Sequence, residues 1–439
     1  MGLALNKRVD KGYRTICALA FVALYSNVLK LWFGSWATLV YDIMLVCALF
    51  FLLNYRWNPK HIPALSTVFI SALLLIILGA FEMLNPNILN HLYSLIEFRK
   101  TLFQLLAIFV VYAYCSDSGD GKTNQKFIRF VVLASLPLIV YGIKQFFLFD
   151  SLDARLYSMM DSAADTNRYG STTRAISFFS GPFHYGMFCV LNMALSLFLA
   201  RKTSDKRYYA IAIVCLVGVF CSYTRTNMAC ALITIAVFLA ISSPRTGESG
   251  RASRVRILLS CLGFALAIAV FVSSPGYINL GNDQLNSLIN GLLNAGQDTR
   301  LLNRFETWDQ AFELIAMHPI SGNGVGAAGD TLSAHSVALN WVTPHNAFIK
   351  VMVELGIVGV AIFVIFAVSS FVLCFRLAKK DADMLSLLLS VAVIVLLNMM
   401  LGSTLGTFPV MSLVYMLIGL CCKRTEALSN TSNRGGGRW

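Results

Sequence analysis

The chain has 439 residues and a formal net charge of +13, and 57% of its residues are hydrophobic while only 13% are charged. This composition is too apolar for a soluble domain of this size, so the chain belongs in a membrane. The basic residues are spread over separate short segments rather than gathered in one patch, which argues against a nucleic-acid-binding surface.

Apolar runs of nearly the length that crosses a bilayer as a helix, about 20 residues, recur along the chain. We expect spans near residues 15–33, 36–53, 62–80, 101–115, 127–149, 182–200, 208–223, 227–241, 257–273, 346–375, 384–402 and 405–422. The predicted fold class is therefore all-α, a polytopic membrane helix bundle of about 12 transmembrane helices.

The basic residues also predict the orientation, because cytoplasmic loops retain Lys and Arg. If the N-terminus is cytoplasmic, the loops on its side collect most of the 35 Lys and Arg residues, and both termini are cytoplasmic. We divide the chain into a transmembrane bundle of spans 1 to 9 (1–273), an extracytoplasmic, periplasmic loop domain (274–345), spans 10 to 12 (346–422) and a cytoplasmic tail (423–439).

Arginines predominate among the cations on the outward side, which are Arg99, Lys100, Arg155, Arg168, Arg174, Arg225, Arg300, Arg304 and Lys350. A guanidinium binds phosphate through a planar fork, so this bias predicts an anionic, phosphorylated ligand. The alternative is that these side chains only reach up to lipid headgroups, which suits Arg99, Arg155 and Arg168.

Arg225 is the strongest of these candidates. It lies in a turn of a few residues between two spans, in "CSYTRTNMAC", so its guanidinium must stay near the headgroup plane. Arg174 and Arg304 lie on two other outward segments and could converge with it on one anion. Binding of a divalent cation by four outward aspartates is left open, although their spacing fits no calcium loop. They are Asp150, Asp153, Asp161 and Asp165.

The segment 324–329, "GVGAAG", has the glycine spacing of a dinucleotide-binding loop. It follows no apolar strand and has no βαβ unit around it, so we interpret the glycines as tightly turned backbone. An apolar stripe precedes it at alternating steps of four and three, typical of an amphipathic helix: Leu301, Phe305, Trp308, Phe312 and Ile315. We expect this helix to lie along the membrane surface or to cap the bundle.

His345 opens the tenth predicted span in "WVTPHNAFIKVMVELGIVG". Histidine titrates near neutral pH and can therefore transfer a proton, although a lone histidine at a helix start is more often structural. His318 and His335 compete with it, and His184 is a further candidate.

Two stretches carry a resemblance to a known family. "RFETWDQAFELIAMHPISGNGVG" followed by "HNAFIKVMVELGIVG" resembles the conserved block of the O-antigen ligase and O-antigen polymerase superfamily. In that block an Arg and a Trp precede "HP" and "GxG", and a His-Asn pair leads after nine residues into "GxxG". His345, Asn346, Gly356 and Gly359 fit the last pattern in full. "SYTR" and "TRAISFFSGPFHYG" resemble weaker upstream signatures.

The resemblance implies a GT-C-like membrane glycosyltransferase of the bacterial inner membrane, with its active site facing the periplasm and with no nucleotide, metal or other cofactor. It implies a glycan donor linked to undecaprenyl diphosphate, His345 as the catalytic residue, and Arg225 and Arg304 as diphosphate contacts, with Arg174 as a further contact. Arg300, Asn346 and His184 are additional candidates.

The acceptor is left open between two choices. With lipid A core as acceptor the enzyme is a ligase of lipopolysaccharide biosynthesis, which the complete His-Asn pattern favours. With another lipid-linked repeat it is a polymerase, which would involve a chain-length regulator. A transporter or flippase of lipid-linked sugars, using Asp42 in the second span, is a rival. The absence of an evident repeat between the two halves argues against it.

The predicted orientation can be tested at Ser333. A cysteine introduced there, in a background without reactive native thiols, should react with an impermeant thiol reagent in intact spheroplasts. Protection of this cysteine until the cells are lysed would contradict the orientation.

Overall fold

The computed structural model is a helical bundle with one two-residue hairpin, β1 (Arg168–Tyr169) paired with β2 (Thr172–Thr173). It describes residues 2–34, 39–53, 63–115, 122–159, 168–169, 172–241, 299–329, 337–378, 381–402 and 404–434. The predicted all-helical membrane architecture is confirmed for these residues.

A helix overlaps every predicted span except the ninth, 257–273, which lies outside the described residues, as does Ser333. In the span predicted at 101–115 the α-helix is limited to the nine residues of α5. These helices are α1 (Gly2–Phe33), α2 (Leu39–Leu53), α3 (Pro63–Glu82), α5 (Leu106–Tyr114), α6 (Lys122–Phe147), α8 (Pro182–Thr203), α9 (Arg207–Ser222), α10 (Arg225–Ala240), α14 (Ala347–Ala378), α15 (Ala382–Leu401) and α16 (Val410–Arg434). Within the described ranges, 6 helices are long and apolar enough to cross a membrane. The total of about 12 spans and the GT-C fold stay predictions.

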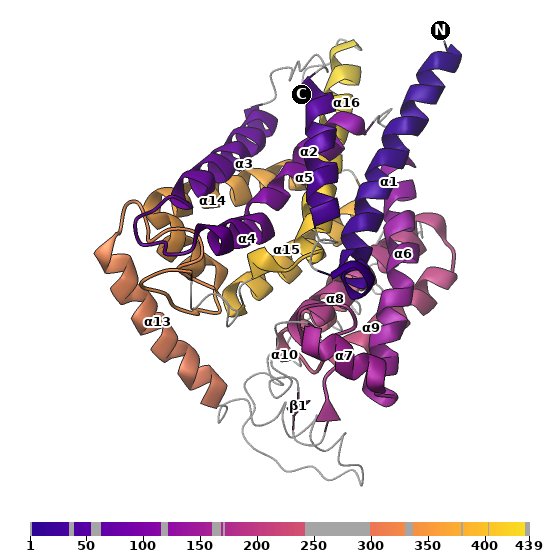
Figure 1. Cartoon of the computed structure of the whole chain (residues 1–439). Helices are drawn as coiled ribbons and strands as arrows, with labels where there is room; N and C mark the ends of the chain where they lie inside the picture. Colours follow the sequence, from indigo (N-terminus) through magenta and orange to yellow (C-terminus); the bar gives the residue numbers. More distant parts are fainter. Residues whose placement is uncertain are drawn as a thin grey trace.

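Shorter elements join these helices. They are α4 (His91–Thr101), α7 (Ser151–Met159), α13 (Thr299–Met317) and the 3-10 turns η2 (Phe103–Leu105) and η6 (Thr404–Gly406). In Figure 1 the start of α1 and the end of α16 lie at the top, whereas α7 and α13 lie toward the bottom. The ends of α8 and α15 that are predicted to be cytoplasmic also meet, because Lys202 pairs with Asp381 at 2.8 Å.

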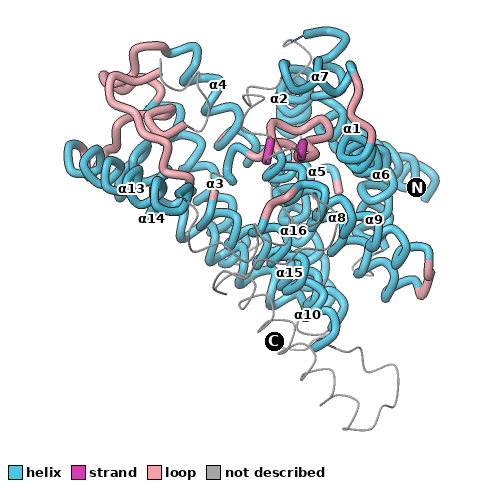
Figure 2. Tube along the Cα trace, turned by 90° about the horizontal axis from the view of Figure 1, so that it is seen from below, coloured by secondary structure: helices cyan, strands magenta, loops and turns pink. Residues whose placement is uncertain are grey.

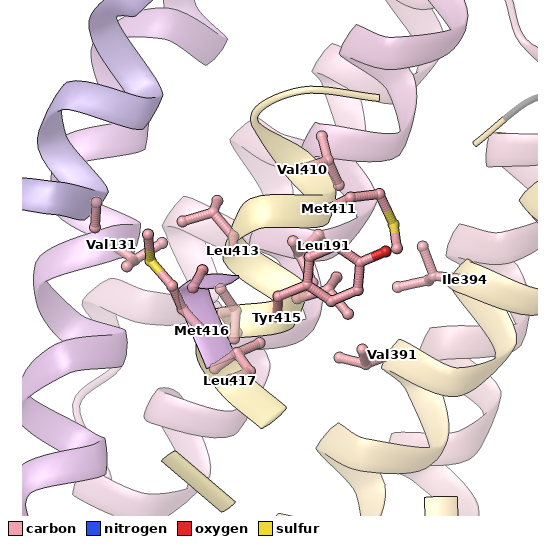
Figure 3. Packing of buried hydrophobic residues seen from close by; sticks show 14 of the residues in the cluster. Val131, Leu191, Val391, Ile394, Val410, Met411, Leu413, Tyr415, Met416 and Leu417 are labelled. Carbon is pink, nitrogen blue, oxygen red and sulfur yellow. The ribbon is translucent and has the colours of Figure 1, made fainter. Parts of the chain in front are cut away.

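The core forms around α8. In the apolar stretch of α8, 83% of the residues are buried inside the protein, against 33% in the apolar stretch of α14. α8 packs against α6, α9, α10 and α15. Figure 3 shows Met411 and Tyr415 of α16 beside Leu191 of α8 and beside Val391 and Ile394 of α15. α8 and α15 are therefore fixed relative to each other by close-packed side chains, which makes them a rigid base for the segments at their ends.

α14 is broken at Gly356, which has a φ of 63° and a ψ of −167°. The loop 318–326 fills the break with backbone hydrogen bonds: Asn323 N donates to Val353 O at 2.8 Å, Gly324 N to Glu354 O at 3.1 Å, and Ile357 N to Pro319 O at 2.9 Å. Figure 2 shows the loops of this region gathered beside α4, α13 and α14. Each of these three backbone N–H groups therefore has a partner across the break, as an apolar surrounding requires.

The glycines of "GNGVG" make this close approach feasible. Gly322, Gly324 and Gly326 all have positive φ, between 84° and 103°. A Cβ at Gly322 would lie 2.5 Å from Glu354 O, and one at Gly356 would lie 2.2 Å from Ile320 O. The interpretation of Gly324 and Gly326 as tightly turned backbone agrees with these φ angles, and the exclusion of a nucleotide stays a prediction.

α4 has an inverted polarity for a surface helix. It exposes Leu92 and Leu95, at 66% and 48% of their surface, and buries Ser94, Glu97 and Thr101. A helix in water hides its apolar face, so this arrangement suits a helix whose outer side meets lipid.

Gly322→Ala should lower the free energy of unfolding by more than the roughly 1–2 kcal/mol that a left-handed conformation costs an L-residue, because the new methyl group also meets Glu354 O. Thermal unfolding of the purified protein in detergent measures the change. The matched control is Gly406→Ala, where the nearest neighbour of the new Cβ is Thr101 Cγ2 at 3.9 Å. Equal stability of the two variants would contradict the close packing of the loop 318–326, the docked loop, against α14.

Candidate functional site

His345 lies immediately before α14 and has a φ of 46°, in the left-handed region. The next residue, Asn346, caps the helix: its Oδ1 accepts from Phe348 N at 2.9 Å and from Ile349 N at 3.1 Å. Asparagine is among the best residues for this position, because its short side chain pairs helix N–H groups that have no partner within the helix. The cap explains the Asn of the His-Asn pair as the residue that starts the helix.

Two further helices hold the same segment. Trp308 of α13 donates its indole N–H to Pro344 O at 2.7 Å. Asn346 Nδ2 donates to Met400 O, near the end of α15, at 3.1 Å. Residues 344–346 are therefore the point where α13, α14 and α15 meet, and the backbone on both sides of His345 is held.

One side of α13 packs against the neighbouring segments: Ala311, Leu314 and Ile315 are buried with Ala327, Ala328, Val337, Ala338 and Val353. Of the predicted apolar stripe, Ile315 is buried here, whereas Phe305 and Phe312 are 52% and 53% exposed. Exposed aromatic residues suit a helix whose apolar face lies along the membrane surface, which is one of the two expected positions. The position of α13 relative to the membrane stays a prediction.

Arg174 lies against the turn that carries Arg225. Its Nε donates to Ser222 O at 3.3 Å and its Nη2 to Tyr223 O at 3.4 Å. Tyr223 has a φ of 57°, and Arg225 is the first residue of α10. Arg174 therefore contacts the backbone of the turn that leads into Arg225, and the convergence of the two arginines on one anion stays a prediction.

His184, in the first turn of α8, belongs to the same neighbourhood. Its Nδ1 is 2.6 Å from Ser180 Oγ. Asn227 of α10 donates both to Phe183 O at 3.0 Å and to Thr224 Oγ1 at 2.9 Å, which joins the start of α8 to the Arg225 turn. His184 is therefore a neighbour of this turn through the main chain of Phe183.

The end of α15 contacts both groups of candidates. Asn346 is bonded to Met400 O, while a Cβ at Gly402 would lie 2.6 Å from Cζ of Phe183. α15 also packs along α8, α10 and α14. His345, through its cap, and the turn of Arg174 and Arg225, through Asn227 and Phe183, are thus both linked to the end of α15.

Arg300 and Arg304 lie in the first turns of α13, and their side chains are outside the described part of the chain. Their convergence with Arg225 stays a prediction. His335, Asp161 and Asp165 also lie outside the described residues. His318 is exposed, and its carbonyl accepts from Gly322 N at 2.9 Å, which gives it the turn role expected beside a proline.

The outward aspartates that the structure describes have other partners. Asp150 and Asp153 pair with Lys144 at 2.5 and 2.6 Å, and Tyr141 donates to Asp153 at 2.8 Å. The Lys144 ammonium lowers the pKa of Asp150 to about 2. Among the described residues no group of three or more His, Cys, Asp or Glu is arranged to hold a metal ion. The ion pairs of Lys144 with Asp150 and Asp153 therefore anchor α7 to α6.

Asp42, the residue on which a transporter would depend, forms an ion pair with Arg99 at 3.3 Å. Both side chains are largely buried, at 15% and 24% exposure. The two residues join α2 to α4, so Arg99 is an ion-pair residue as well as a candidate for contact with lipid headgroups.

Glu97, Lys350 and Glu354 form a buried charge cluster that the sequence analysis did not predict, and the partly exposed Lys100 lies at its edge. Lys350 Nζ is 2.8 Å from Glu354 Oε1 and 4.0 Å from Glu97 Oε2, and Lys100 Nζ is 3.3 Å from Glu97 Oε1. Burial alone would raise the pKa of Glu97, but the two ammonium groups hold it below its ordinary value. The spacing of Lys350 and Glu354 by four residues was the only signal in the sequence.

Residues 210–364 match the family described as O-antigen ligase. The matched stretch contains Arg225, Arg304 and His345, together with α13, the docked loop and the break in α14, whereas Arg174 and His184 lie before it. No curated protein matches the chain.

Arg174→Gln should lower the free energy of unfolding by about 1–3 kcal/mol, because two charge-assisted hydrogen bonds to the turn are lost. Arg155→Gln is the matched control, since Arg155 is exposed on α7, and it should stay within about 0.5 kcal/mol of the wild type. Denaturant unfolding in detergent compares the variants. If both substitutions have the same small effect, Arg174 does not stabilise the Arg225 turn.

Proposed function

We propose that this chain, a member of the O-antigen ligase and polymerase superfamily through residues 210–364, is a membrane glycosyltransferase of lipopolysaccharide biosynthesis. It transfers a glycan from undecaprenyl diphosphate to a sugar hydroxyl of lipid A core at the periplasmic face of the inner membrane. The observation that carries the proposal is the presence of His345 and Arg225 within the family match, with the His345 segment bonded to the end of α15 and the Arg225 turn linked to that end through Asn227 and Phe183.

The proposed chemistry is a displacement with inversion at the anomeric carbon. His345 accepts the proton of the acceptor hydroxyl while the oxygen of that hydroxyl attacks the anomeric carbon of the first donor sugar. The bond from that carbon to the diphosphate oxygen breaks, and the electron pair leaves with undecaprenyl diphosphate. Arg225 and Arg304 bind the leaving group as its negative charge grows, which lowers the barrier when such charges are already in place.

The energy for transfer comes from the donor itself, because the diphosphate is already an activated leaving group. The reaction therefore needs no added nucleotide. Binding of a diphosphate by arginines suits this role, since each planar guanidinium can donate two parallel hydrogen bonds to phosphate oxygens.

The same chemistry would serve a polymerase, in which the acceptor is a second lipid-linked repeat. Reconstitution of the purified protein with a defined lipid-linked repeat separates the two. The ligase proposal expects a product only when lipid A core is added. Elongation of the lipid-linked glycan without lipid A core would replace it with the polymerase.

His345→Ala should reduce transfer by about 10²- to 10⁴-fold, the usual contribution of a general base, and should leave binding of the lipid-linked donor intact. Arg225→Lys and Arg304→Lys should instead weaken donor binding as well as turnover, because lysine keeps the charge but loses the fork. Donor binding and product formation are measured on each purified variant at equal folded amount.

Arg155→Lys is the control and should behave as the wild type, since Arg155 is exposed on α7. Wild-type turnover in His345→Ala would refute the base assignment. Unchanged donor binding in both Arg variants would mean that the diphosphate is bound elsewhere, with Arg174 and Arg300 as the next residues to test.

A further inference from the structure

Trp308 connects α13 to the backbone beside His345. Its side chain is half-buried, its ring packs edge-on against Phe305 with the centroids 5.4 Å apart, and its indole N–H is 2.7 Å from Pro344 O. Tryptophan has a single polar group, so this hydrogen bond uses the only one that its side chain has.

The bond controls the conformation of His345 through the geometry of one peptide unit. The peptide between Pro344 and His345 is planar, so fixing its oxygen also fixes the direction of its N–H on His345. Together with the position of Asn346, that direction sets φ of His345, which is 46°. A left-handed φ costs an L-residue about 1–2 kcal/mol, and such a conformation persists only where the surroundings hold it.

The other side of His345 is held independently. Asn346 is fixed by its two hydrogen bonds to the start of α14 and by its bond to Met400 O. With Asn346 held, loss of the Trp308 bond would remove a constraint on the Pro344–His345 peptide and let that peptide rotate. The imidazole would then leave its present position while α14 stayed in place.

α13 is itself fixed against rotation. Ala311, Leu314 and Ile315 bury one side of the helix against Ala327, Ala328, Val337, Ala338 and Val353. Positions 300, 304 and 308 follow each other at steps of four, so they share one face of α13. One rigid helix therefore carries the anchor of the His345 backbone and the positions of two arginines that are candidates for the diphosphate.

We propose that Trp308 is a positioning residue for His345: its indole N–H holds the Pro344–His345 peptide in the orientation that directs the imidazole at the acceptor hydroxyl. The proposal rests on the proposed function, because it takes His345 as the base. It extends that function to α13 as a whole: by carrying both Trp308 and the two arginine positions, α13 sets the distance between the base and the donor diphosphate.

The test replaces the indole donor without changing its shape. A chain with 3-benzothienylalanine in place of Trp308 keeps the bicyclic ring and loses only the N–H, and Trp308→Phe is the simpler companion variant. Both should lower kcat by about 10- to 100-fold, the usual effect of a small misplacement of a catalytic group, with donor binding unchanged. Phe312→Leu, on the exposed side of α13, is the matched control and should leave kcat unchanged.

A second measurement separates positioning from general damage. In a His345→Ala background, where single-turnover rates are followed over long times, the same replacements at Trp308 should cause no further loss. An equal loss in both backgrounds, or an unchanged kcat in the benzothienyl protein, would overturn the positioning role and leave the base assignment standing. Wild-type turnover in His345→Ala alone would overturn the proposed function, and this inference with it.

Discussion

The break in α14 at Gly356 is the constraint on which the candidate site depends. A helix that is interrupted in an apolar surrounding must find new partners for its backbone groups, and here the loop 318–324 supplies them, with Asn323 N and Gly324 N bonded to α14 carbonyls. The contact is backbone against backbone, so a Cβ at Gly322 or Gly356 would collide with main-chain oxygens. The signature glycines on both sides of His345 in sequence are therefore two halves of one structural joint.

The short part of α14 between His345 and this joint is also held from the side. Glu354 Oε1 accepts from Gly326 N at 3.0 Å and from Lys350, which is 4.0 Å from Glu97 of α4. Removing one member of such a cluster leaves a buried charge without compensation, which is far more costly than losing an exposed ion pair. The cluster therefore ties α4, the docked loop and α14 together, and α14 enters the site in one direction. Because the pKa of Glu97 is below its ordinary value, its contribution to stability is present above the pKa of the unfolded carboxyl group and is lost as the pH falls through the folded-state pKa.

The features that follow from local pattern were predictable from the sequence. Apolar runs gave the described spans, and glycine spacing without a strand gave turned backbone. The features that depend on contacts between distant segments were not predictable: the bond from Trp308 to Pro344 joins residues 36 positions apart, and the bond from Asn346 to Met400 joins residues 54 apart. The side of α13 that Ala311 and Leu314 bury was not predictable for the same reason, because periodicity shows that a helix has an apolar face but not which part of it a neighbouring segment will cover.

Transfer of the proposed kind requires the proton acceptor and the arginines that bind the leaving group to keep a fixed separation, since catalysis by orientation is lost over about 1 Å. The end of α15 provides a physical basis for that separation. The His345 segment is bonded to Met400 O, and Phe183, whose carbonyl accepts from Asn227 beside the Arg225 turn, packs on Gly402 two residues further along. A Cβ at position 402 would meet the Phe183 ring at 2.6 Å and force that ring to move. Because Gly402 has no side chain, both groups of candidate residues can be linked to one rigid helix end, which keeps their separation fixed.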